Sequence, residues 1–180
     1  MTCVVAYTDG KKIYMAADTA GTGSTFTSKN LQTKIFPKDE YAIGYCGSYR
    51  LGQILHYSFA PPLPGKKLPK DEILGFMVTE FIPALKECLA ESGYPEHKED
   101  KRNVSLLVGL RGQIFEIEYS FQVDAWDVPY MAVGSGTYYA LGAMHAVSDT
   151  NEPEHIVRAG LAAAARFDPN VNSEVEMIVV

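Results

Sequence analysis

The chain begins, after Met1, with Thr2-Cys-Val-Val-Ala-Tyr-Thr8, continues through Asp9-Gly-Lys-Lys12 and then reads Ile13-Tyr-Met-Ala-Ala-Asp18. Two runs rich in β-branched and aromatic residues thus flank an Asp-Gly pair, which is a strong local signal for a β-hairpin. We therefore expect a pair of strands at the N-terminus. The residues that follow, 19–29, are rich in Gly, Ser and Thr and are expected to form a loop.

Strands and helices follow one another in blocks along the rest of the chain. Short apolar runs predict strands at residues 33–36, 41–46, 104–110, 113–119, 130–133 and 175–180. Helical patterns occur at residues 51–59, 71–91, 137–147 and 152–167, the first with Ser48 as its cap and the second with a kink at Pro83. Because the elements do not alternate singly, a doubly wound parallel sheet is disfavoured. An α+β fold in four layers (αββα), with two antiparallel sheets between two helical layers, uses every element, although the order alone does not require it.

The composition is that of a soluble globular protein with one domain, residues 1–180. Hydrophobic residues make up 47% of the chain and charged residues 21%. A formal net charge of -6 provides no electrostatic footprint for nucleic acid or for an anionic membrane. No apolar run is long enough to span a bilayer, and the N-terminus lacks the basic segment of a secretory signal. Three cysteines without Cys-x-x-Cys spacing suit reduced thiols in the cytoplasm, and neither a metal nor a cofactor is expected.

The spacing of three residues makes the N-terminal part more specific. Asp18 lies sixteen residues after Thr2, and Lys34 lies thirty-two residues after it. This spacing resembles the start of mature proteasome β subunits and of HslV, the peptidase of a bacterial ATP-dependent protease. Further similar segments follow in the family's order: Gly44-Tyr-Cys-Gly-Ser48, Ala132-Val-Gly-Ser-Gly136 and residues 156–168. The resemblance covers nearly the whole chain and implies the N-terminal nucleophile (Ntn) hydrolase fold.

The resemblance also implies a role for each matching residue. The Thr2 hydroxyl would attack a peptide bond, and the Thr2 α-amine, which titrates at about 8, would act as the base once Met1 is removed. Lys34 beside Asp18 would raise the local positive potential, which favours the neutral amine and the deprotonated hydroxyl. The amide of Gly47 would stabilise the oxyanion, and Ser135 would orient the amine. The implied reaction is acyl transfer to Thr2, followed by hydrolysis of the ester.

Two positions qualify this picture. The family's second active-site aspartate corresponds to Asp168, but the residue three positions later, usually Ser or Thr, is Val171. Support for the amine from this end of the site is therefore expected to be altered. Tyr45 occupies the position that, by resemblance, lines the pocket for the residue before the cleaved bond. Its ring would make that pocket shallow, or would instead pack into the core.

Each candidate residue also has a purely structural interpretation when it is taken alone. Asp18 suits a turn cap, Lys34 suits the surface of a strand, and Gly47 suits a tight turn. Ser135 likewise suits the N-cap of the helix that follows it. The combination of these residues in the family's order is what favours catalysis.

Three functions are compatible with the sequence. The resemblance favours a threonine endopeptidase subunit that assembles with itself into a homo-oligomeric ring or stacked rings and degrades polypeptides supplied by an ATP-dependent unfoldase. Val171 favours a catalytically silent ring or scaffold subunit instead. A small-amide hydrolase on the same fold is the third function. Because only Met1 precedes Thr2, we expect methionine aminopeptidase to expose the threonine.

Overall fold

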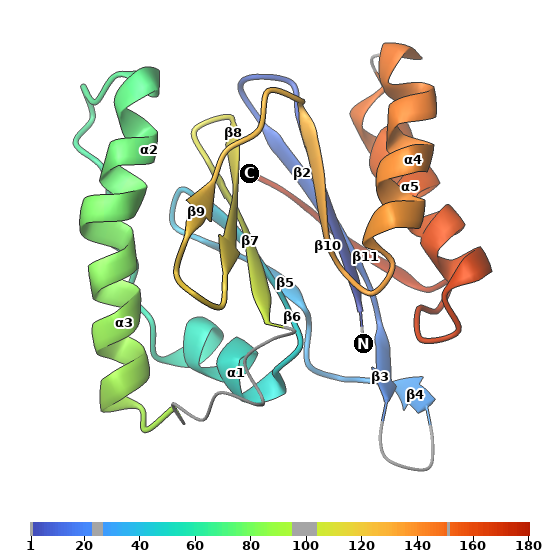
Figure 1. Cartoon of the computed structure of the whole chain (residues 1–180), viewed down its shortest axis with the longest axis horizontal. Coiled ribbons are helices and arrows are strands. Elements are labelled where there is room, and N and C mark those ends of the chain that lie inside the picture. The colour runs from blue at the N-terminus through green and yellow to red at the C-terminus, as the bar shows by residue number, and fades with distance from the viewer. Residues whose placement is uncertain (1, 23–26, 95–103, 151) are drawn as a thin grey trace.

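Two antiparallel β-sheets lie face to face in the middle of the protein. The computed structural model describes residues 2–22, 27–94, 104–150 and 152–180. The first sheet contains, in spatial order, β10 (Tyr130–Gly134), β1 (Cys3–Thr8), β2 (Ile13–Asp18) and β11 (Val175–Val179). The second contains β5 (Ile35–Lys38), β6 (Tyr41–Cys46), β7 (Ser105–Leu110), β8 (Gln113–Glu118) and β9 (Val123–Asp124). Helices cover the outer face of each sheet, so the expected four-layer αββα arrangement is confirmed (Figure 1).

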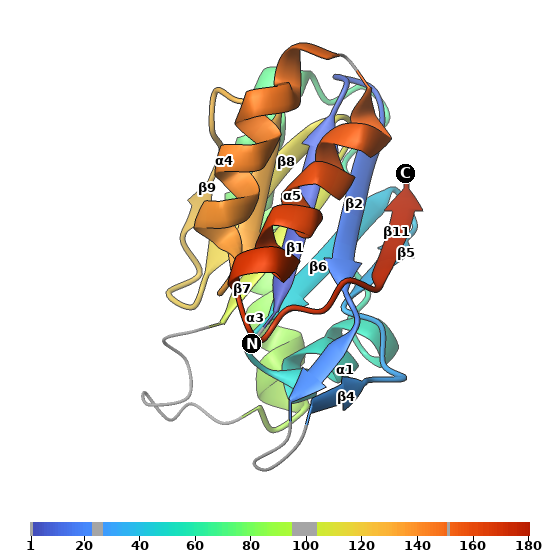
Figure 2. The ribbon, with the colours of Figure 1, turned by 90° about the vertical axis from the view of Figure 1, so that its right-hand side faces the viewer.

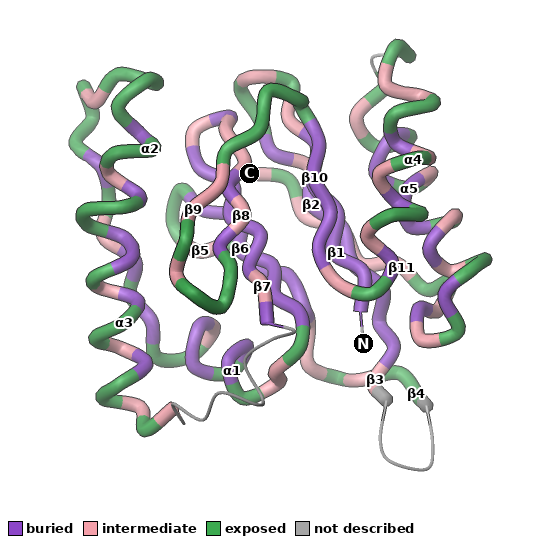
Figure 3. Tube along the Cα trace, viewed as in Figure 1, coloured by how far each residue is buried: buried purple, intermediate pink, exposed green. Residues whose placement is uncertain are grey.

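The N-terminal hairpin is formed by β1 and β2, as predicted. The two strands pair antiparallel from Val4 opposite Ala17 to Thr8 opposite Ile13. Successive side chains of a strand point to opposite faces, and both faces of β1 are covered. Val4 and Ala6 pack against the second sheet, whereas Cys3 and Val5 pack toward helices. This double burial, visible as the continuous purple trace in Figure 3, explains why β1 is apolar at nearly every position.

Two helices cover the first sheet: α4 (Thr137–Val147) and α5 (Pro153–Phe167). Figure 2 shows α5 lying across β1 and β2, with α4 beside it; α4 packs on β10 and β1. The side of α5 that faces the sheet buries Ile156, Val157, Gly160, Leu161 and Ala164. The sequence predicted both helices to within one residue. Their contact with β1 matters for the site, because the first residue before β1 is the candidate nucleophile.

The second helical layer begins with α1 (Tyr49–Tyr57), where Ser48 accepts a hydrogen bond from the Leu51 amide at 3.2 Å and acts as the predicted N-cap. The long helix predicted at residues 71–91 is interrupted. It comprises a 3-10 turn (η1, Lys70–Glu72), α2 (Ile73–Phe76), a π-helical turn (η2, Met77–Phe81) and α3 (Ile82–Glu91). The π-helical turn comes just before Pro83, whose ring needs extra room and whose nitrogen cannot donate to the preceding turn.

Two further segments differ from the prediction. Residues 19–29 are not wholly a loop, because β3 (Ala20–Thr22) and β4 (Thr27–Lys29) pair as a small hairpin. The strand β9 was not predicted, since two residues are too few to show a hydrophobic period. The charged stretch 95–102, predicted as a loop, lies outside the described residues. In the part of the chain that the structure describes, no helix has the length and apolar character needed to cross a membrane.

Candidate active site

Thr2 immediately precedes β1 and is buried, with 6% of its surface exposed. Its backbone carbonyl accepts a hydrogen bond from the Ser135 hydroxyl, with an O–O distance of 3.4 Å. Gly134, the last residue of β10, has a φ of +104°, and a Cβ there would lie 2.1 Å from the Thr2 carbonyl oxygen. Only glycine permits this close approach in this conformation. The turn between β10 and α4 therefore holds Thr2 in place.

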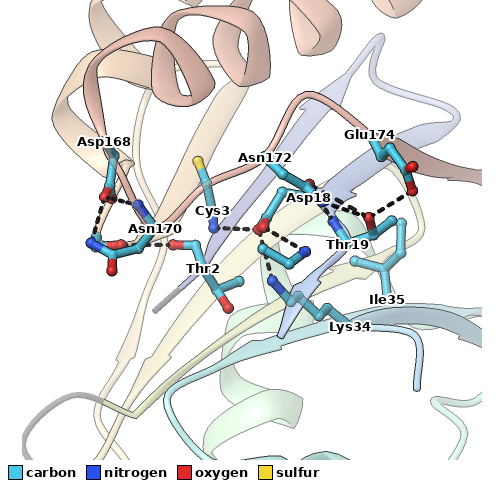
Figure 4. A network of polar contacts seen from close by, with 12 residues as sticks. Thr2, Cys3, Asp18, Thr19, Lys34, Ile35, Asp168, Asn170, Asn172 and Glu174 are labelled. Carbon is cyan, nitrogen blue, oxygen red and sulfur yellow. Dashed lines mark hydrogen bonds and ion pairs between the residues drawn. The ribbon is translucent and has the colours of Figure 1, made fainter. Parts of the chain in front are cut away.

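Asp18, the last residue of β2, connects the strand of Thr2 to Lys34 (Figure 4). Its Oδ1 accepts hydrogen bonds from the Cys3 backbone amide and from Lys34 Nζ, both at 2.9 Å. Its Oδ2 accepts one from the Ala20 amide at 3.0 Å. The Ala20 contact is the turn cap suggested by the purely structural interpretation. The other two contacts go further, because they link the residue after Thr2 to a buried cation.

Lys34 lies between β4 and β5, and only 2% of it is exposed. Its interpretation as a surface residue is therefore wrong. The ion pair with Asp18 is buried on both sides, since neither side chain exposes more than 2% of its surface. Burial lowers the pKa of Lys34, while attraction to Asp18 and the hydrogen bond with it favour the charged form. Lys34 is thus a buried cation held by Asp18, and the same Asp18 oxygen binds the amide of Cys3, the residue after Thr2.

A cavity of about 520 Å³ brings together three of the predicted residues: Thr2, Gly47 and Ser135. Gly47 follows β6 and has a φ of +90°, which glycine adopts without strain. Ser135 belongs to the turn before α4, but it is not the N-cap, because that residue is Gly136 and no side chain caps the helix. The structural interpretation of Ser135 is thus not supported. A peptide bond placed in this cavity would meet a hydroxyl, a glycine turn and a serine from three separate parts of the chain.

Asp168 follows α5 and is also buried, at 6% exposed. Its Oδ1 accepts two hydrogen bonds, both at 2.9 Å, from the backbone nitrogen and the side-chain nitrogen of Asn170. Burial opposes ionisation, but the nearby Ser135 hydroxyl and the two Asn170 donors outweigh it and hold the pKa of Asp168 below its ordinary value. Its Oδ2 is buried and has no hydrogen-bond partner among the described residues. Asp168 therefore offers an unused acceptor close to Ser135.

Asn170 is a residue of this site that the sequence analysis missed. Val171, where the family has a hydroxyl, is buried in the core between the first sheet and α4 and α5. Its side chain cannot support Asp168 by hydrogen bonding, and Asn170 does so from the preceding position. A local signal was present, because Asp-x-Asn sequences commonly form turns in which the first side chain accepts from the backbone two residues later.

The lowered pKa of Asp168 leads to a prediction about stability. A carboxyl with a depressed pKa in the folded state stabilises the fold above its unfolded pKa, and this contribution is lost as the pH falls through the folded value. We therefore expect Asp168→Asn to be less stable than the wild type at pH 7. The difference in urea midpoint should shrink as the pH falls below about 4. Asp71→Asn, which alters an exposed aspartate on η1, should show no such trend. A difference that does not change with pH would contradict this interpretation of Asp168.

Two thiols lie near Thr2 but are poor nucleophiles. Burial, followed by the charges of Asp18 and Asp168, raises the pKa of Cys3 to about 12. Cys46, which lines the cavity, also has a pKa raised by burial. A protonated thiol does not attack carbonyl carbon efficiently. The hydroxyl of Thr2 is therefore the better candidate nucleophile in this cavity.

The expected removal of Met1 concerns a residue outside the described part of the chain. Within the residues that the structure describes, no group of three or more His, Cys, Asp or Glu side chains could hold a metal ion. Of the six predicted site residues, Thr2, Gly47 and Ser135 line the cavity, Asp18 and Lys34 form a buried pair bound to the Cys3 amide, and Asp168 lies close to Ser135.

Comparison with known proteins gives matches among solved structures. No protein-family model matches the sequence, and no curated protein matches it. The Thiobacillus denitrificans protein BPH in complex with epoxomicin superposes with a TM-score of 0.80 at 24% identity, covering 99% of this chain and 98% of that one. A second structure of BPH gives 0.77 at 25% identity, covering 100% and 97%. HslV from Trypanosoma brucei gives 0.68 at 21% identity, covering 99% and 98%.

Proposed function

We propose that this chain, which has the fold of the proteasome β-subunit and HslV class of Ntn hydrolases, is a threonine-type endopeptidase subunit with Thr2 as its nucleophile. The observation that carries the proposal is the convergence of Thr2, Gly47 and Ser135 on one cavity, with a buried ion pair bound to the amide of the residue after Thr2. BPH, which this chain resembles over its whole length, has been captured with epoxomicin. A hydrolase of this class acts on polypeptides through its own N-terminal residue.

The reaction uses the chain's own groups at each step. The Thr2 hydroxyl attacks the carbonyl carbon of a peptide bond, and the Thr2 α-amine accepts its proton directly or through a water. The backbone amide of Gly47 binds the developing oxyanion, a contribution of roughly a hundredfold or more in rate. The carbon–nitrogen bond then breaks as the amine returns the proton to the leaving nitrogen. Water hydrolyses the resulting ester and regenerates Thr2.

The charges around Thr2 suit an amine that must be neutral to act as a base. Lys34, held by Asp18 next to the residue after Thr2, disfavours a second positive charge on the amine. Asp168, oriented by Asn170, and Ser135 bind the amine from the other side. Asn170 thus orients Asp168 by hydrogen bonding, which Val171 cannot do because it has no hydroxyl. The absence of a hydroxyl at Val171 therefore no longer favours a silent subunit.

Tyr45 limits the substrate on the acyl side of the cleaved bond. Its ring is 2% exposed and fills the space above Gly52, where a Cβ would lie 2.0 Å from the ring. Its hydroxyl accepts from Gln32 Nε2 at 2.9 Å and donates to the Thr33 carbonyl at 3.2 Å. A buried ring whose hydroxyl is held by two hydrogen bonds does not move aside readily. We expect a small side chain immediately before the cleaved bond.

The subunit acts in the cytoplasm within a homo-oligomeric ring or stacked rings that an ATP-dependent unfoldase supplies with polypeptide. Support for self-association comes from large apolar side chains on its surface away from the cavity, among them Leu31 and Tyr57, which are more than three-quarters exposed in the single chain. Sedimentation of the purified protein as a stable monomer would contradict the ring. The endopeptidase activity is tested separately, as follows.

The test of the proposed function is covalent labelling by an epoxyketone, combined with intact-mass analysis. We expect protein purified from its native cell to lack Met1 and to gain the mass of one inhibitor molecule. Peptide mapping should place the adduct on the peptide that begins with Thr2. Protein that keeps Met1 and forms no adduct would favour the scaffold function. An adduct on Cys3 or Cys46 would refute Thr2 as the nucleophile.

A further inference from the structure

One wall of the cavity beside Thr2 carries a carboxyl group that the reaction above does not use. Glu116 lies in the middle of β8 and lines this cavity together with Cys46, Ser105 and Tyr138. Its neighbours Phe115 and Ile117 point the other way, into the core under α1 and α3. Since side chains alternate along a strand, Glu116 faces the space between the two sheets. It reaches the cavity at the end where β6, β7 and β10 meet.

The surroundings of Glu116 leave this carboxyl without a positive partner. No ion pair within residues 2–22, 27–94, 104–150 and 152–180 involves it, and the other cavity residues are uncharged. Burial, together with the negative charges of Glu118 and Asp124, raises the pKa of Glu116, and the hydrogen bond from Trp126 only partly offsets this. A half-buried carboxyl in such a setting is stabilised by any cation that enters. The cavity should therefore favour a positively charged group over a neutral or negative one.

The position of the cavity indicates which part of a substrate reaches Glu116. In the proposed reaction the α-amine of Thr2 returns a proton to the leaving nitrogen, so the leaving segment departs on the side of the groups that hold the amine. Ser135 is one of those groups, and the cavity continues from it past Thr137 and Tyr138. Tyr45, which by resemblance lies on the acyl side, is buried in the core with Leu51 and does not line this cavity.

We propose that Glu116 is a specificity-determining residue that binds a Lys or Arg side chain of the substrate just after the cleaved bond. The inference rests on the proposed function and concerns the same cavity. The aliphatic stem of the basic side chain packs beside Tyr138, whose ring is 87% exposed at the cavity, and its charged end meets the Glu116 carboxylate. Substrates with a neutral or acidic residue at that position leave the carboxyl unpaired and are cleaved more slowly.

The test compares two internally quenched peptides that differ only in Lys or Gln after a cleavage site mapped beforehand in an unfolded protein. A dye amide with the same acyl residues, which has no residue after the cleaved bond, reports whether each enzyme is folded and active. The measured quantity is the ratio of kcat/KM for the Lys and Gln peptides. Glu116→Gln is the test variant, and Glu154→Gln, on the exposed side of α5, removes the same charge far from the cavity.

We expect the wild type and Glu154→Gln to prefer the Lys peptide about tenfold, as a charge-assisted hydrogen bond in a half-buried site predicts. Glu116→Gln should reduce this ratio to near one. A wild-type ratio near one, or a ratio that Glu116→Gln leaves unchanged, would overturn the inference while the endopeptidase function stands. Failure of the wild type to cleave both peptides and the dye amide would overturn the proposed function, and this inference with it.

Discussion

Thr2→Ala is expected to lower the rate of peptide hydrolysis by at least about a thousandfold and to remove epoxyketone labelling. The variant keeps the backbone carbonyl that accepts from Ser135 and the amide of Cys3 that donates to Asp18, so the fold should be preserved. What it loses is the oxygen that forms the ester. Hydrolysis of an internally quenched peptide and intact-mass analysis of the labelled protein measure the two effects.

The matched control for this prediction is Thr2→Ser, which keeps a hydroxyl on an N-terminal residue. Both alanine and serine are small, so methionine removal should proceed in each variant and is checked by the intact mass. We expect Thr2→Ser to keep measurable hydrolysis and labelling. Labelling of Thr2→Ala at the wild-type rate would refute the assignment of the nucleophile, whatever the activity of the serine variant.

Lys34→Met is expected to destabilise the protein by about 3–5 kcal/mol, because it leaves the Asp18 carboxylate buried without its cation. Methionine nearly matches the length of the lysine stem, so the loss reports the charge rather than a cavity. The same substitution should lower hydrolysis by about a hundredfold or more, since the positive potential that favours a neutral amine disappears. Urea unfolding and peptide hydrolysis measure these effects.

A second substitution separates charge from packing in this pair. In Lys34→Met combined with Asp18→Asn, no uncompensated charge remains, so part of the lost stability should return while hydrolysis stays low. The return is partial because asparagine keeps only one of the two oxygens that accept from the Cys3 and Ala20 amides. Lys12→Met, on the exposed turn between β1 and β2, should change neither quantity appreciably. Recovery of hydrolysis in the double variant would contradict a catalytic contribution from Lys34, and an undiminished stability in Lys34→Met would contradict the buried pair.

The local elements of the fold could be predicted because their signals lie within a few residues. The Asp9-Gly10 pair between two β-rich runs predicted the first hairpin, and Ser48 before an apolar periodic run predicted the start of α1. The segment 19–29 was harder, since a hairpin of three-residue strands gives almost no periodic signal. Likewise, Pro83 indicated a disturbance in its helix but not that the disturbance would be a π-helical turn.

Some residues of the candidate site could likewise be predicted from the sequence, and others could not. Thr2, Asp18 and Lys34 could be identified because their spacing resembles that of the proteasome β-subunit and HslV family. Asn170 was not singled out, because its hydrogen bonds matter only once α5 brings Asp168 close to Ser135. The roles of these residues in catalysis stay predictions until the variants are measured.

From residue order alone, the chain reveals its four helical regions and its longer strands, while the four layers and the meaning of the Thr2, Asp18 and Lys34 spacing came from the family resemblance. The helices and longer strands follow from local conformational preference and from alternation along a strand, which act over a few residues. Only the tertiary structure reveals that Lys34 is buried rather than exposed, that Asn170 supports Asp168, and that Glu116 shares a cavity with Thr2. The burial of Lys34 and the meeting of Glu116 with Thr2, which are 114 positions apart, require the packing of distant segments that no local pattern records. The Asn170 contact is local, but it bears on the site only because α5 ends close to Ser135. In such buried surroundings, charge and hydrogen bonding have their largest effect.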